Sequence, residues 1–395
     1  MGARRDIGSP DRLSFDFAAQ GAGAGRARSA PPDWYDVTWN PTVGCSAISP
    51  GCDHCQALRT VSQLARMGGK GGARYAGLTA MRRSRQEWTG EVRMQTDVST
   101  WPLLQRTSRR ILVDSLSDLF HETLAIETID ALHAVMAVAH WHRFLVLTKR
   151  ADHMRAYYAD PQTPYRIAAA VDDLATTILP SLGFSGDGAT PAAAIARAVG
   201  AGARRLWGAG LSRVIRAGSS AAGLDPWPLP NLWPGVSVED QERIGRIGDL
   251  LQMPAAARWA CFEPLLGPVS LDAVPVGESH VDALIGDRYL LDRRGRMAPI
   301  SGPAWRPLDW VIAGGEAGAG ARPTDPDWVR GLRDQCVAAG VPFLFRQWGE
   351  WAPDPEDKSG YRMVRLGRRN AGRLIDGRSW NQMPAGMHRG VDRPR

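Results

Sequence analysis

Three of the five cysteines lie within eleven residues, at Cys45, Cys52 and Cys55, with the spacing C-x6-C-x2-C. In a reducing compartment such a group is more typical of a metal site than of a disulfide framework. A structural zinc site usually has four protein ligands, so zinc would also need His54 or a distant residue. Three thiolates instead fit a four-iron iron–sulfur cluster with one iron open to a substrate or cofactor. We expect such a cluster, with zinc and free thiols in a glycine-rich loop as the alternatives.

The other two cysteines, Cys261 and Cys336, lie in or near apolar segments. Free cysteine in such a setting behaves as a small apolar side chain. We therefore expect both to pack in the core.

The segment that holds Cys45, Cys52 and Cys55 is called the cysteine loop below. The elements that must position it are short apolar runs, each followed by polar residues. Helix-like periodicity between several of them, at residues 128–140, 243–251 and 327–339, indicates a parallel sheet. Continuous apolar character is typical of strands buried on both faces. The seven runs are Val37–Trp39, Ile111–Val113, Phe144–Leu147, Leu232–Val236, Trp259–Phe262, Trp310–Ala313 and Val341–Phe345.

This order predicts an α/β fold, a full or partial (β/α) barrel with its active site at the carboxyl ends of the strands. A doubly wound open sheet is the alternative, although no G-x-G-x-x-G follows the first strand to support a dinucleotide fold. We expect a single barrel domain over residues 31–384, with a helical insertion at 158–230 and a hairpin insertion at 277–305. Residues 1–30 should form a disordered arm, and residues 385–395 a basic tail.

The chain has a net charge of +7, and nearly all of its basic residues are arginine. Residues 361–395 hold nine arginines against two aspartates. Contact with DNA, RNA or a nucleotide is one interpretation, and a solvated surface arm is the other. No apolar run is long enough to span a membrane, and the N-terminus lacks the apolar core of a signal peptide, so we expect a cytoplasmic protein without membrane contact.

Several sequence blocks occur together in one order. They resemble the phage-associated three-cysteine-motif proteins, a radical-SAM-like family of largely unassigned function. The resemblance spans about residues 34–384 outside the two insertions, and the chain departs from it at Gln56, where the family usually has tyrosine. The blocks are W-N-P-x-x-G-C and S-P-G-C-x-x-C within 39–55, Ser115–His121, Val146–Arg150, Gly235–Glu239, Glu263–Gly267, Trp310–Glu316, Arg346–Trp351 and Gly367–Arg378.

The resemblance implies a barrel of the radical SAM type that carries a [4Fe–4S] cluster and binds S-adenosylmethionine. One electron, delivered by a reductant protein, would yield a 5′-deoxyadenosyl radical for modification or repair of an unidentified substrate. The protein's part is to bind, orient and exclude water. A zinc- or cluster-bearing nucleic-acid-binding protein without radical chemistry is the alternative, and a barrel with a structural cluster and another activity is a third possibility.

The polar residues after the strands complete the predicted site. We assign catalytic roles to Lys149, Glu263 and Arg346. Lys149 is notable because the chain holds only two other lysines. We assign cofactor binding to the residues after three further strands: Asp114, Ser115, Ser117, Asp118, Glu239, Gly314, Gly315 and Glu316.

Each assignment has a structural alternative. Asp114 to Asp118 could cap a helix, and Gly314-Gly315 could be a tight turn. Lys149 could pair with Asp118 or Glu263, and the glutamates could serve as caps or ion-pair partners.

Overall fold

The computed structural model describes residues 34–105, 107–174, 227–357, 359–385 and 387. The expected N-terminal arm and nearly all of the basic tail lie outside the described residues. So does most of the predicted helical insertion, including its second helix-like piece. The start of that insertion is helical, in α6 (Thr163–Asp173).

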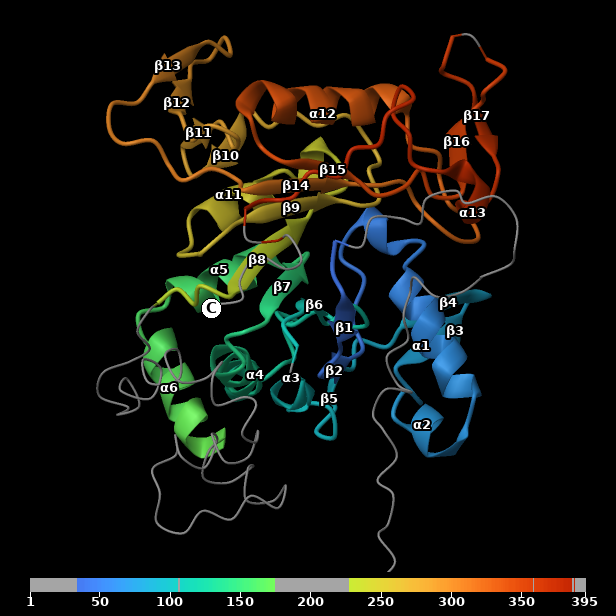
Figure 1. The fold of residues 1–395 in the computed structure, drawn as a ribbon, viewed down its shortest axis with the longest axis vertical. Coiled ribbons are helices and arrows are strands. Elements are labelled where there is room, and N and C mark those ends of the chain that lie inside the picture. Colours follow the sequence, from blue (N-terminus) through green and yellow to red (C-terminus); the bar gives the residue numbers. More distant parts are fainter. Residues whose placement is uncertain (1–33, 106, 175–226, 358, 386, 388–395) are drawn as a thin grey trace, which may run out of the picture.

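Seven parallel strands form one curled sheet, a half-barrel, in which neighbouring strands follow the order of the chain (Figure 1). The partial β/α barrel among the predicted folds is therefore the observed one. Every predicted apolar run contributes one strand. The strands are β1 (Val37–Trp39), β6 (Arg110–Val113), β7 (Arg143–Thr148), β8 (Leu232–Ser237), β9 (Trp259–Phe262), β14 (Trp310–Ala313) and β15 (Phe343–Phe345).

Successive side chains along a strand point alternately into two hydrophobic cores, one on each face of the sheet. In β9, Ala260 and Phe262 belong to the core shared with the outer helices, whereas Trp259 and Cys261 belong to the core on the concave side. This is the period of two that a pleated strand imposes. The outer layer consists of α4 (Ile126–Val138), α5 (Ala151–Ala159), α11 (Gly245–Leu251) and α12 (Pro326–Ala339).

The concave side is closed at the amino ends of the strands. Trp34 packs against Trp259 and Trp310, with ring centroids 5.3 and 6.2 Å apart. The C-terminal segment adds to this closure, because the Gln382 carbonyl accepts a hydrogen bond of 3.0 Å from the indole N–H of Trp310, the first residue of β14. The carboxyl ends are left for a site.

The link from β1 to β6 carries the cysteines. It contains β2 (Thr42–Val43), the 3-10 turn Pro50–Cys52, α1 (Gln56–Arg66), α2 (Gly69–Ala73), β3 (Thr79–Arg82), β4 (Arg85–Trp88), β5 (Arg93–Met94) and α3 (Trp101–Leu104). In Figure 1, α1, α2 and the β3–β4 hairpin lie together at one side of the sheet, in blue to teal.

The predicted hairpin insertion is a four-stranded antiparallel sheet, because a further turn at Gly277 adds strands before the expected pair. Its strands are β10 (Val274–Val276), β11 (Ser279–Val281), β12 (Arg288–Leu291) and β13 (Met297–Pro299). The remaining elements are the 3-10 turn Gln241–Arg243, β16 (Trp351–Pro353), β17 (Met363–Arg365) and α13 (Arg368–Ala371). Among the described helices, none has the length and apolar character needed to cross a membrane.

Candidate active site and metal centre

A cavity of about 310 Å³ opens at the carboxyl ends of the strands. All but two of the predicted site residues line it. The exceptions touch lining residues: Glu239 pairs with Lys149, and a Cβ added to Gly314 would stand 3.0 Å from Glu263. The predicted residues that line the cavity are Cys45, Cys52, Cys55, Asp114, Ser115, Ser117, Asp118, Lys149, Glu263, Gly315, Glu316 and Arg346.

Strand alternation explains why Lys149 and Glu263 reach this cavity. Glu263 follows β9 two residues after Cys261, and Lys149 follows β7 two residues after Leu147. Residues two apart on a strand share a face, and Cys261 and Leu147 both line the concave side. The pleat of the sheet therefore carries both charged side chains inward.

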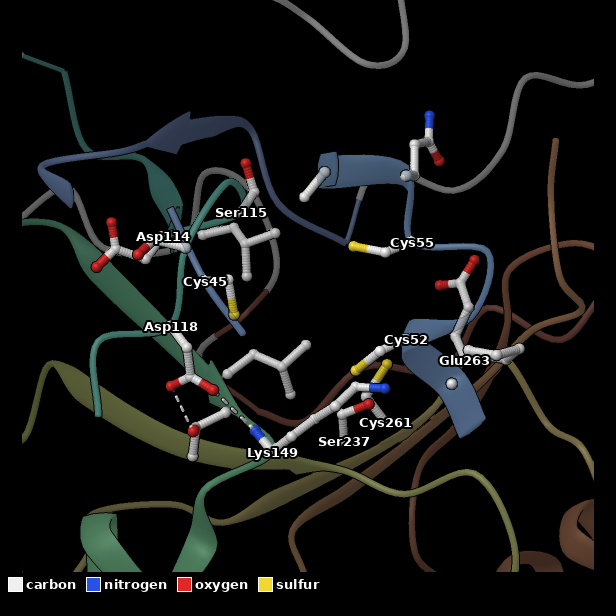
Figure 2. Close-up of a pocket in the computed structure, with 18 of the residues that line it drawn as sticks. Cys45, Cys52, Cys55, Asp114, Ser115, Asp118, Lys149, Ser237, Cys261 and Glu263 are labelled. Carbon is white, nitrogen blue, oxygen red and sulfur yellow. Dashed lines mark hydrogen bonds between the residues drawn. The ribbon is translucent and has the colours of Figure 1, made fainter. Parts of the chain in front are cut away.

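The three thiols point into one common space from the cysteine loop (Figure 2). Cys55 stands at the N-terminus of α1, where the nearby backbone N–H groups of Ala57 and Leu58 act to lower the pKa of its thiol. Burial nevertheless raises the pKa of Cys55, and it raises the pKa of Cys45 to about 12. Burial thus disfavours the thiolate forms of Cys45 and Cys55, and a bound metal centre would offset that effect.

Within the described residues, no group of three or more His, Cys, Asp or Glu side chains could hold a metal ion. The thiols thus share a cavity without meeting around a single-ion centre. His54, the predicted local candidate for a fourth zinc ligand, also lines the cavity. Its ring packs at Gly320, where an added Cβ would stand 2.7 Å from it.

The cysteine loop rests on a buried ion pair between Lys149 and Glu239 (Figure 2 shows Lys149 below the thiols). The fully buried Glu239 also accepts a hydrogen bond of 2.7 Å from the Ser49 hydroxyl and one of 2.9 Å from Arg246. Burial by itself raises the pKa of Glu239, but the two cations outweigh it and leave that pKa below its ordinary value. Lys149 therefore pairs with neither Asp118 nor Glu263, the two partners expected from the sequence.

Arg322 makes a second contact with the cysteine loop. Arg322 donates to both carboxylate oxygens of Glu316, at 2.6 and 2.9 Å, and to the carbonyl of Pro50 at 2.8 Å. Glu316 is buried, and both of its oxygens are engaged by this arginine. The predicted Gly314-Gly315-Glu316 motif thus positions the cysteine loop.

A third contact involves Arg150, which the sequence assignment omitted. Its guanidinium donates to Asp118 at 3.0 Å and to the Ser46 hydroxyl at 2.6 Å, and it lies 3.8 Å from the Cys45 sulfur. The positive charge lowers the pKa of Cys45, against the stronger effect of burial. Arg150 directly follows Lys149, so its place among the polar residues after β7 could have identified it as a site residue.

The residues after β6 also hold the loop. Asp114 accepts from Thr42 N–H at 3.0 Å, and the Ser117 hydroxyl donates to the Gly44 carbonyl at 2.7 Å. Ser115 donates to the Asn40 side chain at 3.0 Å. These groups were predicted to bind cofactor, and the structure places them at the cavity wall with these polar atoms engaged by the chain.

Glu263 and Arg346 form another wall of the cavity. One guanidinium nitrogen of Arg346 lies 2.8 Å from each Glu263 oxygen, and Gln347 donates to the same carboxylate at 2.9 Å. Cys261, predicted to pack as an apolar side chain, does so in the concave core but also lines the cavity. Cys336 is buried in the outer core, as expected.

No curated protein and no solved structure matches the chain. One family does match, over residues 30–384, which include every strand and every site residue described above. The chain belongs to this family, which is described as "Protein of unknown function (DUF5131)".

Proposed function

We propose that this protein is an iron–sulfur enzyme of the radical S-adenosylmethionine type, acting in the modification or repair of a substrate. The observation that carries the proposal is the placement of three thiols with the spacing C-x6-C-x2-C in one cavity at the carboxyl ends of a curled parallel sheet. This is the end at which barrel enzymes build their active sites.

The residues present fit a cluster better than a zinc ion. Zinc needs its ligands about 2.1–2.3 Å from one centre, usually four of them. No described group meets that requirement. A cubane cluster presents separate iron atoms to separate thiolates, so its ligands line a cavity without meeting at a point. Cys45, Cys52 and Cys55 would hold it.

When bound, such a cluster supplies one electron to the sulfonium of S-adenosylmethionine and so yields a 5′-deoxyadenosyl radical. Arg150 favours the thiolate of Cys45, and Lys149, which lowers the pKa of Cys55, favours that thiolate too. Trp34 and Tyr35 line the cavity and help to exclude water. The chain thereby supplies charge, orientation and a sheltered space.

Lys149, Glu263 and Arg346 are the proposed catalytic residues. In the described part of the chain, no hydrogen bond reaches Nε or Nη2 of Arg346, although its Nη1 is held by Glu263. That guanidinium therefore has donors to offer a carboxylate or phosphate in the cavity. Asp118 completes the wall as the partner of Arg150. Among the remaining predicted cofactor-binding residues, Asp114 has one buried carboxylate oxygen, Oδ2, without a hydrogen-bond partner in the described part of the chain.

The test is cleavage of S-adenosylmethionine by anaerobically reconstituted protein with dithionite as reductant. We expect 5′-deoxyadenosine by liquid chromatography, and its loss in Cys45→Ala, Cys52→Ala and Cys55→Ala. The matched control is Cys336→Ala, which removes a buried thiol from the outer core. A reconstituted wild type that binds iron but forms no 5′-deoxyadenosine would support the structural-cluster alternative instead. Equal product from the Cys45→Ala variant would also contradict the proposal.

A further inference from the structure

A strongly basic segment lies directly after the cysteine loop. Residues 56–93 contain eight basic and two acidic side chains, a net charge of +6 in a chain whose total is +7. This segment forms α1, α2 and the β3–β4 hairpin. Its charge is separate from that of the C-terminal arginines, on which the sequence interpretation concentrated.

The tip of the β3–β4 hairpin carries three exposed arginines, at positions 82, 83 and 85. The two-residue turn holds Arg83 at φ +46° and Ser84 at φ +63°. Both values lie in the left-handed region, where Asn-Gly is the favoured pair for a hairpin turn. An arginine at this apex is unfavourable for the backbone, and that is an outlier from which a functional role can be argued.

Two of these arginines have no acidic partner among the described residues. Arg82 and Arg83 make no ion pair there, whereas Arg85 pairs with Asp53 at 3.1 Å. Arg85 also donates to the backbone carbonyl of Asp53 at 2.8 Å. The hairpin is thus tied to the cysteine loop through one arginine and presents two others to solvent.

The other end of the hairpin reaches the cavity. Trp88, the last residue of β4, lines the cavity together with Cys55 and packs against the small core that includes Val61 and Leu78. One hairpin therefore has an aromatic ring at the cavity and, at its tip, guanidinium groups without an ion-pair partner in the described part of the chain. Successive phosphates outside a pocket and an aromatic ring within it are what a nucleic-acid strand requires.

We propose that the β3–β4 hairpin binds the phosphates of a nucleic-acid strand and directs a nucleotide toward the cavity, with Arg82 and Arg83 as phosphate contacts and Trp88 as a stacking surface. The proposal gives the substrate class of the proposed enzyme as nucleic acid. It rests on the proposed function only for the chemistry inside the cavity. Binding at the tip needs no cluster. A site within a cavity also implies an unpaired or extruded base, so single strands should bind better than duplex.

The experiment measures fluorescence anisotropy of a labelled single-stranded DNA, its duplex and an RNA of the same sequence. The variant is the double substitution Arg82→Gln and Arg83→Gln. The matched control is Arg293→Gln with Arg294→Gln. That pair is exposed at the β12–β13 turn, which lies far from the β3–β4 hairpin in Figure 1. We expect at least roughly tenfold weaker binding for the first variant only, and a salt slope reduced by about 1.5.

A second variant separates the loss of a phosphate contact from misfolding of the hairpin. Arg83→Gly relieves the strained turn, so it should stabilise the hairpin while weakening binding. Unchanged affinity in both hairpin variants would overturn the inference and assign any binding to the C-terminal arginines. Equal, arginine-dependent binding to phosphatidylserine-containing vesicles would overturn it in favour of a membrane surface.

Iron content, measured on each sample, separates this inference from the proposed function. Wild type that holds the cluster and cleaves S-adenosylmethionine but binds no nucleic acid would refute the hairpin role alone. Wild type that binds nucleic acid through the hairpin but holds no iron would refute the enzyme and leave the hairpin role standing.

Discussion

Lys149 and Glu239 form a buried ion pair directly beneath the cysteine loop. Gly51 lies so close to the pair that an added Cβ would stand 2.5 Å from the Lys149 nitrogen and 2.5 Å from a Glu239 oxygen. The two residues follow neighbouring strands, β7 and β8, and Ser49 joins the loop to the same glutamate. The ion pair thus sets the height of the loop above the sheet.

Substitution of Gly51 by alanine should displace the loop. The new methyl group would overlap charged atoms that are held by Arg246 and Ser49, so we expect a loss of about 1–3 kcal/mol in the free energy of unfolding and weaker iron retention. Urea unfolding and iron analysis measure the two effects.

The matched control for this substitution is Gly331→Ala in α12, where an added Cβ meets nothing within 4 Å. Alanine in a helix interior is favoured, so that variant should gain about 0.5–1 kcal/mol. Equal effects of the two substitutions would contradict the close packing of loop and ion pair.

Asp114 should make the protein less stable as pH rises. Burial raises the pKa of Asp114 from 3.8 to about 8. The folded state therefore keeps a proton that the unfolded chain releases, so this contribution to stability is complete below about pH 4 and is lost as pH rises through 8. Asparagine mimics the neutral acid and tolerates the φ of +54° at this position.

We expect the difference in the free energy of unfolding between wild type and Asp114→Asn to fall by up to about 1.4 kcal/mol per pH unit as pH rises from about 4 to about 8. Urea unfolding of both proteins across pH 5–8 gives the difference curve, in which all other titrating groups cancel to a first approximation. A difference that is flat with pH would show that Asp114 is ionised throughout.

Arg322 should hold the cysteine loop without contacting any ligand. Its loss in Arg322→Gln frees the Pro50 carbonyl and leaves Glu316 without its arginine, so Cys52 should become more accessible. Alkylation of Cys52 by iodoacetamide in metal-free protein, followed by mass spectrometry, should be several-fold faster.

Arg322→Lys should restore part of the protection, because a single ammonium reaches one of the two partners. The control is Arg330→Gln, which removes surface pairs with Asp327 and Asp376. An alkylation rate that Arg322→Gln leaves unchanged would mean that Arg322 is not needed to hold the loop.

The sheet could be predicted from the sequence because its determinants are local. Each strand is a short apolar run ended by polar residues, and even the short run at Val37–Trp39 supplies a strand. Because the strands are parallel, the polar residues that follow them meet at one end of the sheet. The hairpin insertion was underestimated because Pro275 interrupts the apolar pattern of its first strand, Val274–Val276.

The roles within the site could be predicted less well. That Glu239 lies near Lys149 follows from strand order. In contrast, the bond from Arg322 to the Pro50 carbonyl and the bond from Ser115 to Asn40 depend on contacts between distant parts of the chain. Residue type alone does not show which polar atoms the protein uses for itself. Arg150 was missed for the same reason: its contact with Cys45 spans 105 positions.

The metal content of protein purified without oxygen tests the central claim most directly. A four-iron cluster on Cys45, Cys52 and Cys55 predicts a brown protein with about four iron and four sulfide per chain, broad absorbance near roughly 400 nm, and loss of both elements in Cys52→Ala but not in Cys336→Ala. A colourless protein that carries one zinc per chain, or no metal at all, would contradict it.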